Sequence, residues 1–298
     1  MLKEKGPLLL ASNHPNSFLD SIIIDTLFNH PVWSLARGDV FKKPFYIRLL
    51  HRLKILPIYR TSEGVENLQE NYKTFDACLN IFRKQGVIMI FSEAKSINEW
   101  HLRSLKKGTA RLALKAWEEN IPLKVLPVGI NYSSFEKFGK NVFINFGEII
   151  LREEIPVNQP DGISHLAFNK ILDQQLKGLV FEIEKSDNEK QERVLERKPN
   201  VPEKILLAIP AIAGWMLHLP LYLPIRSIIF KKTRNTDHYD SIMTALLIVL
   251  YPLYLLLVTI SVFLLTKNSY TFLLLLAMPA LAWSYVRLKP QLDVKHVS

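Results

Sequence analysis

The stretch from Leu8 to Asp20 reads LLLASNHPNSFLD and joins a short apolar run to an amphipathic segment through a polar turn. The apolar run at residues 8–12 is typical of a strand that is buried on both faces. Residues 17–28 carry apolar side chains at helical spacing, which predicts a helix. We therefore expect His14 at the end of the first strand, and Asp20 about one turn into the first helix.

The same alternation of apolar runs and amphipathic segments continues along the chain. Further strands are predicted at residues 32–36, 55–59, 87–91, 125–130 and 142–146, and further helices at residues 43–53, 65–85, 105–119 and 165–184. This order predicts an α/β domain over residues 1–185, in which helices flank a layered, mostly parallel sheet. The charged residues 186–204, which include two prolines, indicate a linker.

The last third of the chain, residues 205–298, has the composition of an α-helical membrane region. Three runs contain no charged residue: 205–225, 242–266 and 270–286. The 25 residues of the second run would span about 37 Å as a helix, enough to cross a hydrocarbon layer of about 30 Å. Buried helices in a soluble core are the alternative, but the leucine-rich runs have no polar face to present to water. We therefore predict a transmembrane hairpin over residues 242–266 and 270–286.

The distribution of lysine and arginine predicts the orientation of this hairpin. Its connection, residues 267–269, carries one lysine, whereas seven lysines and arginines flank its two ends. The positive-inside bias places both ends in the cytoplasm. Residues 205–225 contain Pro210, Pro220 and Pro224, which favours a re-entrant or interfacial segment over a simple crossing.

The N-terminal residues do not predict export of the first domain. Residues 1–11 offer an apolar run of only three leucines, so no signal peptide is expected. We therefore expect an integral protein of the inner (cytoplasmic) membrane, with the first domain facing the cytoplasm.

Composition narrows the class of partner. The chain has 298 residues, with 38 Lys and Arg against 28 Asp and Glu, and a formal net charge of +10. This excess favours an anionic partner such as lipid headgroups or phosphorylated metabolites, and the absence of a nucleic-acid module argues against nucleic acid. The single cysteine, Cys78, excludes an internal disulfide and a cysteine-based zinc site. It lies among apolar residues of a predicted helix, as a buried residue would.

His14 and Asp20 could form a catalytic pair. A carboxylate within reach of an imidazole orients the ring and stabilises its charged form. The histidine could then remove a proton from a substrate hydroxyl that attacks an acyl group, without a serine or cysteine nucleophile. The alternative is structural: His14 caps a loop, and Asp20 occupies the first turn of a helix, where the macrodipole favours a negative charge.

Four sequence motifs in order resemble the glycerolipid acyltransferases, the family of glycerol-3-phosphate and lysophosphatidate acyltransferases. They cover about residues 6–132. Asn13-His14 with Asp20 resembles the first motif, and residues 56–60, LPIYR, resemble the second. Residues 91–96, FSEAKS, resemble the third, and residues 125–128, VLPV, resemble the fourth.

The resemblance assigns roles to particular residues. It implies that His14 is the general base, that Asp20 orients it, and that Asn13, Glu93 and Ser96 belong to the substrate site. Arg60 would bind the substrate phosphate, as a planar guanidinium at a strand end can do. Glu93 could bind a glycerol hydroxyl or hold Arg60, and structural pairing is the alternative for its carboxylate.

Backbone and helix-end groups complete the expected site. Lys107 opens a predicted helix whose free N–H groups would add to its attraction for an anion, although a solvated lysine is the alternative. Backbone N–H groups between Asn13 and Ser17 are the expected donors to the thioester oxyanion.

The first and third motifs depart from the family pattern. Five residues separate His14 from Asp20 where the usual motif has four, and the longer form resembles a branch that includes fungal-type enzymes. Ala94 replaces the glycine of the third motif. If that glycine has a positive φ, the alanine would have to adopt the same conformation.

Residues 42–54 form a basic amphipathic element suited to an anionic bilayer surface. As a helix, this segment places Arg48 and Arg52 on one face and apolar side chains on another.

The resemblance implies a membrane-bound O-acyltransferase of phosphatidate biosynthesis. The donor would be acyl-CoA or acyl-carrier protein, the acceptor glycerol-3-phosphate or 1-acylglycerol-3-phosphate, and membrane lipids would surround the C-terminal region. No metal or redox cofactor is implied. An enzyme that acylates another lipid, such as an amino-acid lipid, and an inactive lipid-binding homologue are the alternatives.

Overall fold

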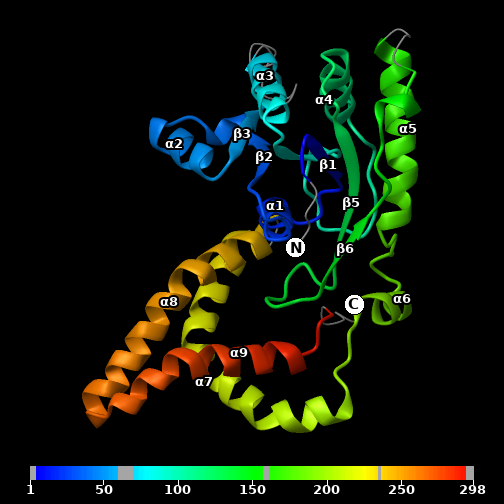
Figure 1. Cartoon of the computed structure of the whole chain (residues 1–298). Coiled ribbons are helices and arrows are strands. Elements are labelled where there is room, and N and C mark those ends of the chain that lie inside the picture. The colour runs from blue at the N-terminus through cyan, green and yellow to red at the C-terminus, as the bar shows by residue number, and fades with distance from the viewer. Residues whose placement is uncertain (1–4, 60–69, 157–160, 234–235, 293–298) are drawn as a thin grey trace. The chain divides into compact units, whose positions relative to one another are not determined.

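The computed structural model describes residues 5–59, 70–156, 161–233 and 236–292 (Figure 1). The chain divides into two compact units. One comprises residues 1–131 and 143–184, and the other comprises residues 132–142 and 185–298. Each unit is described by itself.

The first unit is built on a six-stranded sheet in the order β3-β2-β4-β1-β5-β6. β1 pairs in parallel with β4 and β5, and β2 pairs in parallel with β3 and β4. The mostly parallel α/β sheet predicted from the sequence is confirmed. The strands are β1 (Leu8–Ser12), β2 (Val32–Arg37), β3 (Ile55–Ile58), β4 (Val87–Phe91), β5 (Lys124–Tyr132) and β6 (Val142–Phe146).

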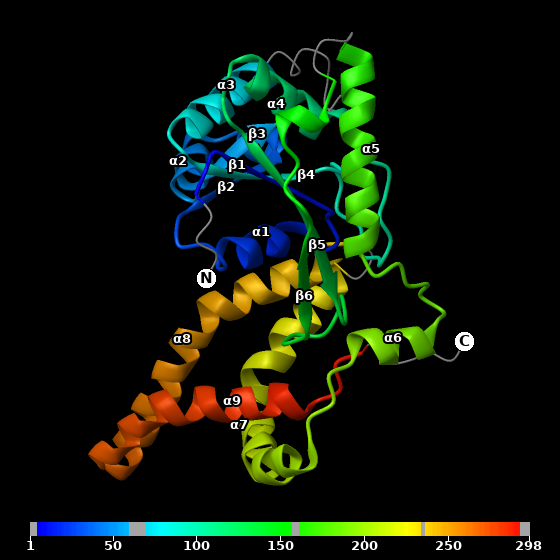
Figure 2. The ribbon, with the colours of Figure 1, turned by 45° about the vertical axis from the view of Figure 1, so that its right-hand side comes forward.

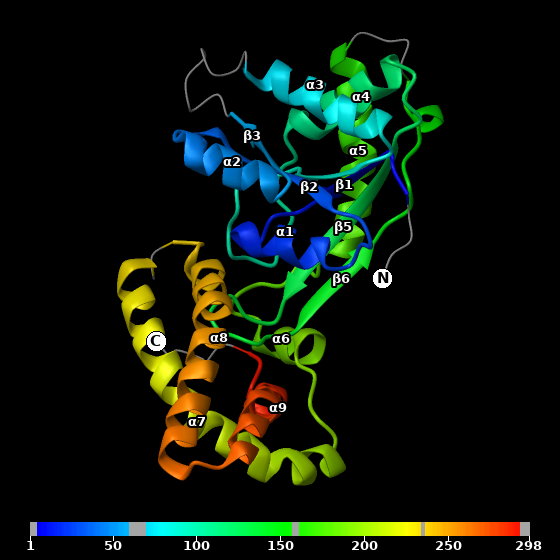
Figure 3. The same cartoon turned by 60° about the vertical axis from the view of Figure 1, so that its left-hand side comes forward.

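Five helices accompany this sheet: α1 (Ser17–Asp25), α2 (Pro44–Arg52), α3 (Glu70–Arg83), α4 (Lys107–Glu118) and α5 (Asp161–Leu179). Figures 2 and 3 show α1 on the opposite face of the sheet from α3 and α4. α5 ends at Leu179, five residues before the predicted boundary at residue 184. The carbonyl of Leu179 accepts hydrogen bonds from Asn131 Nδ2 at 3.0 Å and Asn145 Nδ2 at 2.8 Å, which tie the end of the helix to β5 and β6.

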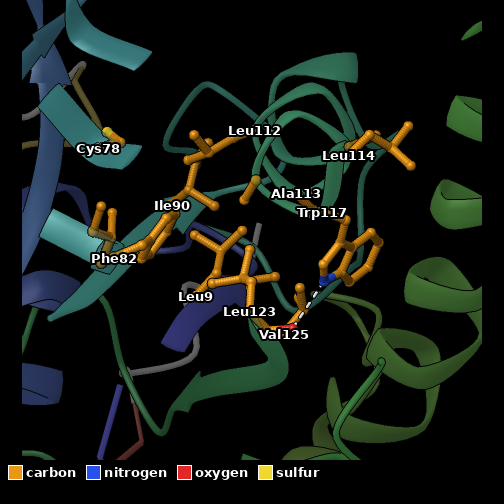
Figure 4. Close-up of a cluster of buried hydrophobic side chains, with 14 of the residues drawn as sticks. Leu9, Cys78, Phe82, Ile90, Leu112, Ala113, Leu114, Trp117, Leu123 and Val125 are labelled. Atoms are coloured by element: carbon orange, nitrogen blue, oxygen red, sulfur yellow. Dashed lines mark hydrogen bonds between the residues drawn. The ribbon is translucent and has the colours of Figure 1, made fainter. Parts of the chain in front are cut away.

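The core of this unit lies between the sheet and α3, α4 and α5 (Figure 4). Side chains of alternate strand residues, such as Leu9 and Val125, pack there against Phe82 and Trp117. The indole Nε1 of Trp117 donates to the Leu123 carbonyl at 2.9 Å, so its one polar group is satisfied. The residues of β1 are buried on both faces of the sheet, as the uninterrupted apolar run predicts.

The second unit is mainly helical: α6 (Asn188–Leu195), α7 (Val201–Thr233), α8 (Tyr239–Thr266) and α9 (Leu274–Leu288). Three of its helical segments are long and apolar enough to cross a membrane: Val201–Thr233, Tyr239–Thr266 and Ser269–Leu288. The last begins with a short 3-10 turn, Ser269–Leu273, before α9. The two apolar runs predicted to form a hairpin lie in α8 and in this last segment.

α7 is a single helix that contains Pro210, Pro220 and Pro224, so the prolines do not end it. Figures 1 and 2 show that it bends sharply along its length, as prolines inside a helix commonly cause. The prediction that residues 205–225 are re-entrant or interfacial stays a prediction, because 33 helical residues are also long enough to cross.

Close backbone packing and polar contacts join the helices of the second unit. A Cβ atom on Gly214 of α7 would lie 2.1 Å from the Leu281 carbonyl oxygen of α9. Tyr254 of α8 donates its hydroxyl to the Leu217 carbonyl at 2.7 Å. The connection between β5 and β6 also belongs to this unit, and its Lys140 forms a buried ion pair with Asp240 at the start of α8.

Candidate active site

His14 and Asp20 lie in direct contact at the carboxyl end of β1. The His14 Nδ1 atom is 2.8 Å from Asp20 Oδ2, and the Asp20 side chain is fully buried whereas that of His14 is 15% exposed. The imidazole stacks on Phe91 with ring centroids 3.7 Å apart. Because Nδ1 faces the carboxylate, Nε2 is the nitrogen that can accept a proton from a substrate. The five-residue spacer is therefore compatible with the predicted pair.

Left-handed backbone at Ser17 accompanies this five-residue spacer. Ser17 has φ +50° at the start of α1. Asp20 Oδ2 also accepts a hydrogen bond from the Asn16 N–H at 2.9 Å. The carboxylate thus holds both the imidazole and the turn that leads into the helix.

Glu93 holds the loop that carries His14. Its Oε2 accepts from the His14 N–H at 2.8 Å, and its Oε1 accepts from the Arg103 N–H at 2.7 Å. The guanidinium of Arg103 adds a charged hydrogen bond at 2.9 Å to Oε2. These contacts favour structural pairing, which the sequence left open for Glu93. Its basic partner is Arg103, which the sequence interpretation did not identify.

The side chains of Asn13 and Ser96, like that of Glu93, form hydrogen bonds with backbone groups of other segments. Asn13 donates from Nδ2 to the Ile130 carbonyl at 3.0 Å and accepts from the Ile130 N–H at 2.8 Å, so it links β1 to β5. The Ser96 hydroxyl accepts from the Ser17 N–H at 2.7 Å. Both polar side chains are buried.

The backbone around His14 corrects one expectation from the sequence. The N–H groups of His14, Asn16 and Ser17 each donate to a protein side chain, and Pro15 has no N–H. At His14, Asn16 and Ser17 the backbone N–H groups are therefore already engaged, which argues against these three as the free donors that were expected for an oxyanion. Their hydrogen bonds hold the turn at residues 13–17 in place instead.

Lys107 lies at the start of α4, beside the end of β4. The N–H of the preceding residue, Lys106, donates to the Ser92 carbonyl at 2.8 Å, and the Ser92 and Thr109 hydroxyls are 3.0 Å apart. Both lysines are exposed. The helix N-terminus and these ammonium groups give this edge of the sheet a positive potential.

The predicted phosphate ligand Arg60 lies outside the described residues. β3 ends at Ile58, and Tyr59 follows it, fixed by the Asn71 amide through bonds of 2.8 and 2.7 Å. β2 lies between β3 and β4 in the sheet and ends at Arg37. Arg37 forms an ion pair with Asp39 and is a further cationic candidate at this edge. Its position after the predicted strand at residues 32–36 was the sequence signal that could have identified it.

Ala94, in the third motif, adopts the left-handed conformation with φ +61°. This is the conformation for which a glycine is best suited, because an L-residue with a Cβ atom is strained there. The alanine therefore keeps a glycine-like turn directly after Glu93.

Two other classes of site receive little support from the described residues. Burial raises the pKa of the Cys78 thiol to about 12, which argues against a nucleophilic thiolate. Among residues 5–59, 70–156, 161–233 and 236–292, no group of three or more His, Cys, Asp or Glu is placed to hold a metal ion. That the activity needs no metal or redox cofactor stays a prediction.

Comparison with known proteins gives one family match and one similar solved structure. Residues 1–131 match the family model described as "Acyltransferase". A search of curated proteins found no match. Among solved structures, the chain resembles the 1-acyl-sn-glycerophosphate (LPA) acyltransferase PlsC from Thermotoga maritima. The identity is 16% and the TM-score 0.43, over 62% of this chain and 69% of that one.

Proposed function

We propose that this chain, whose residues 1–131 match the acyltransferase family model, is a membrane-bound O-acyltransferase of phosphatidate biosynthesis. It moves a fatty acyl group from acyl-CoA or acyl-carrier protein to glycerol-3-phosphate or 1-acylglycerol-3-phosphate. The observation that carries the proposal is the 2.8 Å contact between His14 Nδ1 and the buried carboxylate of Asp20. The pair provides a general base for a substrate hydroxyl, and neither a serine nor a cysteine nucleophile is needed.

In the proposed reaction, His14 Nε2 takes the proton of the acceptor hydroxyl as that oxygen attacks the thioester carbonyl carbon. Asp20 stabilises the imidazolium that forms. The tetrahedral intermediate then collapses, the carbon–sulfur bond breaks, and the imidazolium returns its proton to the leaving thiolate. Products are the acyl ester and the free thiol, and His14 is again neutral.

Cationic groups at the carboxyl edge of the sheet support an acceptor that carries a phosphate. Lys107 lies at the start of α4, and Arg37 at the end of β2. Arg60, two residues beyond the end of β3, joins them by its position in the sequence. Parallel strands bring their carboxyl ends to one edge, so Arg37 and Lys107 lie on the side of the sheet where His14 is found.

The membrane part of the proposal rests on the three apolar helical segments. We propose that the protein is integral to the inner membrane and that its catalytic unit faces the cytoplasm, as the distribution of lysine and arginine around the apolar segments predicts. Resistance of the protein to extraction from membranes with alkaline carbonate would test the anchoring.

The direct test is an acyl-transfer assay in membranes that contain the full-length protein. Labelled acyl-CoA or acyl-carrier protein is supplied with glycerol-3-phosphate or with 1-acylglycerol-3-phosphate. His14→Ala should abolish transfer but leave the protein in the membrane, and His30→Ala, at an exposed histidine, should not reduce it.

The acceptor that is used decides the reaction. His14-dependent acylation of glycerol-3-phosphate assigns the first acylation of phosphatidate synthesis, and acylation of only the lysolipid assigns the second. Turnover that survives His14→Ala would refute the role of His14 as general base. Lack of turnover with both acceptors would reject the proposed substrates, and a panel of other lipid acceptors would then separate a different acyltransferase from an inactive homologue.

A further inference from the structure

α2 exposes a row of large apolar side chains that the proposed chemistry does not use. Phe45 is 66% exposed, Leu49 is 43% exposed, and Leu53, which caps the helix, is 59% exposed. No residue of this nine-residue helix is buried. Phe45, Leu49 and Leu53 follow one another at intervals of four residues, so they form a continuous row along one side of the helix.

A different side of α2 packs on its own unit. Ile47 and Leu50 are half-buried, and α2 lies at the β3 edge of the sheet, as Figures 1 and 3 show. The exposed row is therefore additional to the face that attaches the helix to the domain. Such a row costs free energy in water, so something apolar is expected to cover it.

The charges beside the exposed row indicate what covers it. Arg48 and Arg52 are exposed and, four residues apart, form a second row next to the apolar one. Lys42 and Lys43 precede the helix and are also exposed. The sequence contains no acidic residue between Asp39 and Glu63. A row of apolar side chains beside a row of cations matches an anionic lipid surface, which offers acyl chains and phosphates at adjacent depths.

We propose that α2 lies in the headgroup layer of an anionic bilayer, with Phe45, Leu49 and Leu53 inserted toward the acyl chains. Arg48 and Arg52 then contact lipid phosphates. The apolar helices of the same chain would keep a bilayer within reach of α2, so even a weak intrinsic affinity would hold it there. If the proposed function holds, this contact brings the catalytic unit to the surface from which a lipid acceptor emerges.

The depth of a spin label on α2 tests this proposal without any measurement of activity. The full-length protein carries a nitroxide at Leu49→Cys or, as matched control, at Leu166→Cys of α5, where the native leucine is 69% exposed. Cys78 is buried and should not react, which labelling of the unsubstituted protein will verify. Collision of each label with oxygen and with a water-soluble nickel chelate is measured in vesicles of phosphatidylcholine with one quarter phosphatidylglycerol.

The label at residue 49 should collide with oxygen but be protected from nickel, whereas the label at residue 166 should be open to nickel. Nickel access at residue 49 equal to that at residue 166 would overturn the proposal. Protection from both reagents would also overturn it, because that pattern indicates burial against protein.

The proposed contact of Arg48 and Arg52 with lipid phosphates is tested by comparing anionic with neutral vesicles. A double variant carries Arg48→Gln and Arg52→Gln. In the anionic vesicles, it should have a lower ratio of membrane-bound to unbound α2, by about fivefold for each arginine removed. In vesicles of phosphatidylcholine alone, the same double change should have little effect. Lys73→Gln with Lys84→Gln, in and after α3, is the control. An equal effect of both double variants would exclude a specific contact of α2 with anionic lipid.

Discussion

Two buried carboxylates, Asp20 in the first turn of α1 and Glu93 after β4, contact His14 in different ways. Asp20 accepts from the His14 ring and is placed to stabilise charge on it. Glu93 accepts from the His14 backbone and from Arg103, so it fixes the position of the loop that carries the ring. Asp20 thus acts through the imidazole and Glu93 through the backbone. Both residues belong to motifs that resemble those of the same family.

Replacement of Asp20 by asparagine should remove the charge that supports the His14 imidazolium but keep the size of the side chain. We expect the turnover number to fall by roughly 10²- to 10⁴-fold, with a much smaller change in KM. Initial-rate kinetics in membranes will measure both. Asp76→Asn, at an exposed carboxylate paired with Lys115, is the control and should leave both constants unchanged. A turnover number that Asp20→Asn does not alter would show that Asp20 is structural.

Ala94→Gly should stabilise the first unit, because the alanine has φ +61°. A left-handed alanine costs about 1–2 kcal/mol, and the extra freedom of glycine in the unfolded chain offsets about 0.5–1 kcal/mol of the relief. Thermal unfolding followed by fluorescence should therefore show a net gain of about 0.5–1 kcal/mol. Ala77→Gly, inside α3, should instead destabilise by about 1 kcal/mol. A loss in both variants would contradict the strain assigned to Ala94.

The positions of two helices, α4 and α7, depend on contacts with the neighbouring elements. α4 begins beside the end of β4 because Lys106 donates to the Ser92 carbonyl, and this places a positive helix end at the candidate site. α7 and α9 approach closely because Gly214 has no side chain. In apolar surroundings, small residues at such crossings allow the dispersion contacts that hold helices together.

Gly214→Val should disrupt the contact between α7 and α9. The new Cβ atom would lie 2.1 Å from the Leu281 carbonyl oxygen, which forces the two backbones apart. We expect a loss of about 1–3 kcal/mol or more, measured as a lower unfolding temperature of the detergent-purified protein. Gly178→Ala, where a Cβ atom would meet nothing within 4 Å, is the control and should not lower it. Equal effects of the two variants would show that the close approach is unimportant.

For the whole molecule, the open matter is how many times the chain crosses the membrane. The structure has three helical segments that are long and apolar enough, whereas the charge distribution predicts that only two cross. An even number of crossings returns the chain to the side on which residues 1–200 lie. If α7 crosses as well, as the third span, residues 226–240, with four lysines and arginines, would lie on the opposite side.

Reporter fusions after residues 200, 235, 268 and 298 will decide the topology. We expect the fusions at 200, 235 and 298 to report the cytoplasm and the fusion at 268 to report the exported side. The physical reason is the cost of moving Arg226, Lys231 and Lys232 across the bilayer. An exported reporter at residue 235 would mean that α7 crosses, and the re-entrant or interfacial assignment would be wrong.

The sequence by itself determined the elements, because hydrophobic periodicity is a local property of the chain. The strands at residues 8–12, 87–91 and 142–146 have the predicted bounds, and His14 and Asp20 could be paired from their spacing around one turn. The apolar helices could be predicted in the same way, because an uncharged run of 25 residues is long enough to span a hydrocarbon layer and has no polar face for water.

Only the tertiary structure decided which polar groups satisfy one another. Arg103 is ten residues from Glu93, and Ser96 is 79 residues from Ser17, so no local pattern indicates either contact. The same holds for the backbone N–H groups near His14, which were expected to face the substrate but donate to Glu93, Asp20 and Ser96. Buried donors and acceptors must find partners, and the packing of distant segments determines which partners are within reach.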